Sequence, residues 1–170
     1  MMKRLILPII LLFLFILESI FVDVLPASFI MEDHLLVPHF LFVTIVFISI
    51  RGNRNEGMLL GAIYGLMFDI VYTGILGLYL FSFPLIAYVI SKLAGILQNH
   101  IVIISILSIV SVVILEFFVF GVNSLIGYTT ITMNTFIERR LISTAILNGI
   151  FVILLSYPLA KLIDKLSVVE

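Results

Sequence analysis

Three acidic residues lie inside long apolar runs of this 170-residue chain: Glu18 in "LFILESIFV", Asp69 in "GLMFDIVY" and Glu116 in "VILEFFVF". A carboxylate near the centre of a bilayer costs about 2.5–3.5 kcal/mol on insertion scales, so such side chains usually face protein or water. Two interpretations are open. The acids can form a polar site for a ligand, a proton or a partner, or they can pair with other groups of the chain and hold helices together.

Two basic residues, Arg139 and Arg140, precede the last apolar run. The planar guanidinium of Arg is well suited to bidentate pairing with a carboxylate. At 1.5 Å per residue, the three acids lie roughly 20–24 Å from the polar residues that open their runs. If the three runs cross in the same direction, the carboxyls share one depth. We therefore predict an intramembrane polar layer, in the outer third of the membrane, of Glu18, Asp69, Glu116, Arg139 and Arg140.

A stripe of small residues ends at one of these acids. Gly57, Gly61, Gly65 and Asp69 follow one another in steps of four residues, which places them along one slanted side of a helix. Small residues let a second backbone approach closely, and such approach drives helix association in lipid. The stripe therefore predicts a helix-packing groove at Gly57, Gly61 and Gly65, filled either by another helix of this chain or by a partner's helix.

The composition places the chain in the membrane class. Hydrophobic residues make up 63% and charged residues 11%, against about 25% charged in a soluble domain, and the mean hydropathy is +1.36. The absence of cysteine excludes disulfides and thiolate metal sites. The net charge of −1 argues against a nucleic-acid partner. We expect one all-α domain, embedded in the lipid bilayer.

Apolar runs of nearly spanning length divide the chain into six predicted transmembrane helices. The first is expected to be a retained helix and not a signal peptide, because it is too long for an h-region and carries Glu18. The second and third are short, so five crossings remain open if one of them enters the bilayer without crossing it. The predicted spans are about 4–25, 37–50, 57–72, 78–97, 101–120 and 141–163.

The basic residues set the predicted orientation, because Lys and Arg near span ends stay on the cytoplasmic side. Six spans with a cytoplasmic N-terminus put only Arg139 and Arg140 outside. The inner side then holds Lys3, Arg4, Arg51, Arg54, Lys92, Lys161 and Lys165. Both termini are therefore expected in the cytoplasm.

Other polar residues suggest no catalytic or metal chemistry. The three histidines are not at metal-ligand spacing, and His34 and His39 are expected at a water interface. Because no Ser/His/Asp set, HExxH or phosphate-binding loop is present, we expect neither enzymatic activity nor a cofactor. "MNTFIERR" could open a helix with Asn134 or Thr135 as its cap. Asn148 is expected to hydrogen-bond across helices.

The segment "GAIYGLMFDIVYTGILGLYLFSF", residues 61–83, resembles the signature of the bacterial rod shape-determining MreD family: a glycine-rich helix ending in Asp, a short turn, then "LG.Y.F". "LPIILLFLFILESIF" and "LEFFVFGVNSLI" are also similar to that family, and the resemblance covers nearly the whole chain. It implies a non-enzymatic subunit of the cytoplasmic membrane, in the machinery that inserts peptidoglycan along elongated cells. Asp69 matches the family's acid, Gly61 and Gly65 match its helix glycines, and Glu18 and Glu116 match acids at comparable places.

The resemblance also implies partners and a fold. The partners are MreC, which has one spanning helix, and indirectly the filament protein MreB, the glycosyltransferase RodA and its transpeptidase. The fold is expected to be similar to the six-helix substrate-binding subunits of energy-coupling-factor vitamin transporters. The predicted function is a membrane scaffold that binds MreC and helps position peptidoglycan synthesis. The alternative is a small-molecule, vitamin-type substrate-binding subunit of a transporter, and a proton- or ion-coupled carrier is a third hypothesis.

Overall fold

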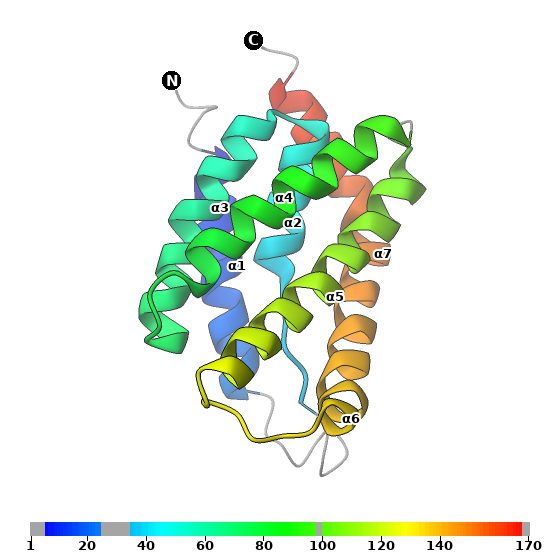
Figure 1. Cartoon of the computed structure of the whole chain (residues 1–170). Helices are drawn as coiled ribbons and strands as arrows, with labels where there is room; N and C mark the ends of the chain where they lie inside the picture. The colour runs from blue at the N-terminus through cyan, green and yellow to red at the C-terminus, as the bar shows by residue number, and fades with distance from the viewer. Residues whose placement is uncertain (1–5, 25–34, 98–99, 168–170) are drawn as a thin grey trace.

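The computed structural model describes residues 6–24, 35–97 and 100–167, and all regular secondary structure in these ranges is helical. Figure 1 shows the helices gathered into one bundle with α2 near its centre. The elements are α1 (Ile6–Val24), α2 (Phe40–Arg51), α3 (Arg54–Phe68), the π-helix η2 (Asp69–Thr73), α4 (Leu78–Ile96), α5 (Ile101–Leu125), the short α6 (Met133–Phe136), the π-helix η3 (Ile137–Leu141) and α7 (Ile142–Ser167).

Within the described ranges, three helices are long and apolar enough to cross a membrane: Leu78–Ile96, Ile101–Leu125 and the continuous helix Met133–Leu166. The apolar segment of α1 and the whole of α2 are shorter. The chain is therefore an all-helical membrane protein, and six crossings stay a prediction. The first turn of α1 and the last turn of α7 lie at the same end of the bundle (Figure 1), although which side of the membrane this end faces stays a prediction.

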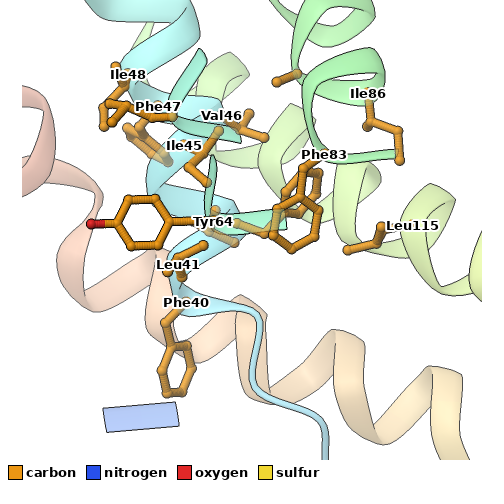
Figure 2. Close-up of a cluster of buried hydrophobic side chains, with 14 of the residues drawn as sticks. Phe40, Leu41, Ile45, Val46, Phe47, Ile48, Tyr64, Phe83, Ile86 and Leu115 are labelled. Atoms are coloured by element: carbon orange, nitrogen blue, oxygen red, sulfur yellow. The ribbon is translucent and has the colours of Figure 1, made fainter. Parts of the chain in front are cut away.

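The core of the bundle is built around α2, whose residues from Phe40 to Ser49 are all buried. Figure 2 shows its side chains surrounded by Tyr64 of α3, Phe83 and Ile86 of α4 and Leu115 of α5. A helix that is apolar on all sides is typically enclosed by other helices. At 12 residues, α2 is roughly 18 Å long. Because protein surrounds it, α2 does not have to match the thickness of the bilayer.

The helix bounds differ from the predicted spans at three places that matter for the site, two of them at α2 and α5. Helix α2 begins at Phe40, not at residue 37, because residues 35–39 form no helix. Helix α5 continues to Leu125, five residues beyond the predicted end at residue 120. These five residues include Asn123, which faces a cavity described below. Hydrophobicity alone ended the predicted span at the first polar residues.

The last helix starts earlier than residue 141, because α6 and η3 lead directly into α7. Its cap is Thr132, whose hydroxyl accepts a hydrogen bond from the backbone N–H of Thr135 at 3.4 Å. The predicted caps Asn134 and Thr135 lie inside the first turn. The sequence interpretation passed over Thr132, although Thr is also a preferred cap residue.

The glycine stripe is filled by helices of this chain. A Cβ atom at Gly65 would lie against the carbonyl group of Tyr79, 2.7 Å from its carbon, and 3.0 Å from Leu80 Cα. At Gly61 it would lie 3.3 Å from the backbone nitrogen of Pro84, and at Gly57 2.9 Å from Ser49 Cα. Helix α3 thus packs its small residues against the backbones of α4 and α2. The groove has no room for a partner's helix.

We predict that Gly65→Ala destabilises the protein by about 1–3 kcal/mol, the usual cost of overpacking a tight interior. The added methyl group would meet backbone atoms of α4, which cannot move independently of the helix. Thermal unfolding of the detergent-purified protein, followed as loss of the monomer peak in size-exclusion chromatography, measures the effect.

Gly121→Ala in α5 is the matched control, because a Cβ atom there meets nothing within 4 Å. It should be neutral or stabilising by up to about 1 kcal/mol, since Ala favours helix more than Gly does. Equal stability of the two variants would contradict the close approach of α3 and α4.

Candidate functional site

The extended segment 35–39 leads into α2 and is held by polar groups of η3 and α7. The backbone N–H of Leu35 donates to the carbonyl of Arg139 at 2.8 Å. The Asn148 amide pairs with the segment on both sides of Pro38: its Oδ1 accepts from His39 N at 2.8 Å, and its Nδ2 donates to the carbonyl of Val37 at 3.0 Å. Pro38 itself has no N–H to satisfy. The side chain of Asn148 therefore takes the place of a neighbouring strand for a partly buried, non-helical stretch of backbone.

Glu18 of α1 caps the start of α2. Its Oε1 accepts a hydrogen bond at 2.8 Å from the backbone N–H of Leu41, one of the first N–H groups of a helix, which have no partner within the helix itself. The carboxylate also lies at the end of α2 where the helix dipole favours negative charge. Glu18 is 3% exposed. It therefore fixes the position of α1 against the first turn of α2.

Asp69 caps the start of α4 in the same way, from the first residue of η2. Its Oδ2 accepts from the N–H groups of Gly77 at 2.7 Å and Leu80 at 3.1 Å, and its Oδ1 accepts from Tyr79 N at 2.8 Å. Gly77 has φ +108°, a conformation that glycine adopts without steric cost. A single fully buried carboxylate thus closes the turn between η2 and α4 and satisfies three backbone donors.

Glu116 of α5 joins three parts of the chain. Its Oε1 lies 2.7 Å from Nε2 of His39, and its Oε2 accepts from Nε of Arg140 at 2.7 Å. A second, longer bond runs from Nη2 of Arg140 to Oε1 at 3.4 Å. Both Glu116 and His39 are 1% exposed. The carboxylate therefore connects α5 to the residue that precedes α2 and to η3.

The five residues of the predicted polar layer do not form one cluster. Glu116 pairs with Arg140, whereas Glu18 and Asp69 accept from backbone N–H groups at two separate helix starts. Arg139 is exposed, and its backbone carbonyl accepts a hydrogen bond from the segment before α2. Each of the three acids thus contacts backbone or side-chain groups of another part of the chain, as expected for residues that hold helices together.

His39 was expected at a water interface, and the structure contradicts this expectation. It is buried against Glu116 because the helix that follows it begins three residues later than predicted. His34 lies outside the described residues.

Asn148, expected to bond across helices, is a site residue that the sequence prediction did not include. Its isolated position in an apolar helix was the available signal, because buried amides in bundles need partners.

A cavity of about 410 Å³ lies beside this group of residues. It is bounded by η2 and the first turn of α4, by the last turns of α5 and by α6 and η3. Phe136, Tyr79 and Arg140 lie on its wall, so the guanidinium that pairs with Glu116 also borders open space. Within the described ranges, no group of three or more His, Asp or Glu side chains is placed to hold a metal ion.

Comparison with known proteins points to one family. A family model described as rod shape-determining protein MreD matches residues 3–166. The rod shape-determining protein MreD of Bacillus subtilis (strain 168) is 36% identical over 157 residues, which cover 92% of this chain and 91% of that protein. No solved structure gives a significant match. The matched region includes every site residue described above.

We predict that Glu116→Leu lowers the free energy of unfolding by about 3–5 kcal/mol, because it leaves a partly buried guanidinium without its carboxylate. The double variant Glu116→Leu/Arg140→Leu should recover much of this loss, since both charges are removed together. Thermal unfolding in detergent measures both variants.

Glu138→Leu is the matched control, because Glu138 is an exposed acid of η3, the π-helix that also carries Arg140. Its effect should stay within about 0.5 kcal/mol, as for most surface substitutions. If the double variant is as unstable as the sum of its two single variants, Glu116 and Arg140 do not stabilise one another.

We predict that Asp69→Asn costs about 1–3 kcal/mol, the penalty for leaving a buried hydrogen-bonding group without a partner. The Asn side chain keeps one acceptor oxygen but presents an NH₂ group to backbone N–H donors of the α4 start. Thermal unfolding again provides the measurement.

Asp164→Asn serves as the control, because Asp164 is 44% exposed and pairs with Arg51 near the surface. Exposed ion pairs contribute about 0–1 kcal/mol. A smaller effect at Asp69 than at Asp164 would show that the α4 cap carries little of the stability.

Proposed function

This chain belongs to the rod shape-determining MreD family, and from that premise we propose that it is a non-enzymatic scaffold of the cell-elongation machinery. As a multi-pass protein of the cytoplasmic membrane, it would bind the single spanning helix of MreC. Through MreC it would help to position peptidoglycan synthesis, together with MreB, RodA and the transpeptidase of RodA. The result of this positioning is a rod-shaped or elongated cell.

The observation that carries the proposal is that the buried acids contact other parts of the chain. Glu18 and Asp69 each cap a helix start, and Glu116 pairs with Arg140 and His39. Residues held in this way fix one arrangement of helices. A carrier would instead need polar groups that change partners as the substrate moves. A bundle with a fixed interior suits a protein whose role is to hold a partner in place.

The proposal places MreC on the outside of the bundle, because α4 and α2 fill the glycine groove. Among the three long apolar helices, the helix Met133–Leu166, which contains α7, is the least covered by the rest of the chain. In its apolar stretch 22% is buried, against 44% for α4 and 39% for α5. Exposed apolar side chains recur along α7 at steps of four and three residues, the spacing that lets two helices pack along their length. They are Ile142, Ile146, Ile150, Ile153 and Tyr157.

We predict that single cysteines at Ile146, Ile150 or Ile153 form disulfide cross-links to cysteines placed in the spanning helix of MreC. The chain contains no cysteine of its own, so each cross-link reports one position. Co-expression in membranes, oxidation and non-reducing electrophoresis would measure the cross-linked fraction. The yield should be highest at positions on the exposed stripe.

Two sets of positions control for chance encounters. Gly61→Cys faces α4 and should give no cross-link, and cysteines at Ile9 and Phe13 report the exposed side of α1. Cross-links on α1 alone would move the binding face away from α7. Cross-linking to MreC no stronger than to an unrelated single-span protein would reject the scaffold proposal.

A further inference from the structure

The cavity between η2, α5 and η3 borders two residues of the contacts that fix α2 and α4, Tyr79 and Arg140, and leaves polar atoms of both facing open space. We propose that it binds the phosphate-bearing head group of a membrane lipid, with the acyl chains lying along the outer surface of the bundle. The volume of about 410 Å³ falls within the range of about 300–1,000 Å³ common for ligand sites. It can hold a glycerophosphate group but not the chains attached to it.

The charge of the cavity wall favours an anion. Arg140 is the one charged residue among the described residues that line it. The acid that pairs with Arg140, Glu116, is not part of the lining and contacts Nε and Nη2 of the guanidinium. No bond of Nη1 to another described residue is observed. Guanidinium groups bind phosphate oxygens strongly because both the charge and the spacing of the donors match.

A second donor on the wall is Tyr79. Its side chain is 6% exposed, and its hydroxyl makes no hydrogen bond to the described residues, although its backbone N–H is bound by Asp69. A phenolic hydroxyl on the wall of a cavity is available to donate a hydrogen bond to a bound group. Thr73, Asn123 and Thr129 add further polar side chains to the same wall. The site therefore presents polar side chains from four segments, η2, α4, α5 and the loop after α5, together with one cation.

The apolar part of the site argues for a lipid over a soluble phosphate. Val119, Phe120 and Ile131 line the cavity beside the polar groups. Close in the chain to the lining residues Ile75 and Asn123, the apolar side chains of Leu76 (71% exposed) and Leu125 (89% exposed) face away from the bundle. A free phosphate would leave these surfaces uncovered, and a neutral diacylglycerol would leave Arg140 and Tyr79 without an acceptor. Tyr, which occurs three times in the lining as Tyr72, Tyr79 and Tyr128, is also enriched at the level of lipid head groups.

Titration of the purified full-length protein in detergent, followed by native mass spectrometry, tests the proposal with three probes. Dioctanoyl phosphatidylglycerol carries both head group and chains, glycerol 3-phosphate carries the phosphate alone, and dioctanoylglycerol carries the chains alone. The phospholipid should bind at least about tenfold more tightly than either part. Tyr79→Phe should weaken phospholipid binding by about tenfold, the effect of one hydrogen bond to a charged group, and leave dioctanoylglycerol binding unchanged.

Tyr79→Phe keeps the aromatic ring, whose centroid lies 5.4 Å from that of Phe68 and 5.2 Å from that of Phe83. The fold should therefore be retained. Asn123→Trp fills the cavity without removing an observed side-chain contact and should also weaken binding. Tyr157→Phe, on the exposed stripe of α7, is the matched control and should change nothing. The proposal would be overturned if the phospholipid bound no more tightly than dioctanoylglycerol or no more tightly than glycerol 3-phosphate. It would also be overturned if both cavity variants bound the phospholipid as tightly as the unchanged protein.

Discussion

Backbone N–H groups at the start of a helix have no partner inside that helix, and a membrane interior offers no water to bind them. This constraint governs the bundle, because α2 and α4 both begin at buried positions. Carboxylates from neighbouring helices accept hydrogen bonds from these N–H groups: Glu18 binds the start of α2, and Asp69 binds the start of α4. The extended backbone before α2 is hydrogen-bonded by the side-chain amide of Asn148. Each of these side chains therefore both satisfies the backbone and sets the position of a helix.

The short, enclosed α2 depends on this arrangement. Because its first turn is satisfied inside the bundle, α2 does not have to extend to the membrane surface, and helices can surround it on all sides. Its other end is tied to α7 by the Arg51–Asp164 pair, with Nε donating to Oδ1 at 3.1 Å. The glycine stripe then brings α3 against α4 closely enough for Asp69 to reach the α4 start. Helix packing and capping thus depend on one another.

The consequence for function is a division between interior and exterior. Inside, the acids hold the helices in one arrangement, which suits the scaffold proposed for this member of the MreD family. Outside, the exposed stripe of α7 and the cavity beside Arg140 remain available for a partner helix and for a lipid. Glu116 lies between the two regions, because it binds His39 within the core and Arg140 at the cavity wall. Occupation of the cavity would therefore act on a residue that also contacts the core.

The sequence alone determined the membrane class, the helical fold and the acids that protein must surround, because composition and the cost of a buried charge are properties of the chain itself. It also indicated a glycine stripe for close packing. Only the tertiary structure decided the partners: Asp69 binds backbone and not Arg, and His39 is buried. The physical reason is that depth along a helix follows from residue count, whereas the facing partner depends on where the neighbouring helix begins. Hydrophobicity did not reveal that α2 begins at Phe40 inside the bundle.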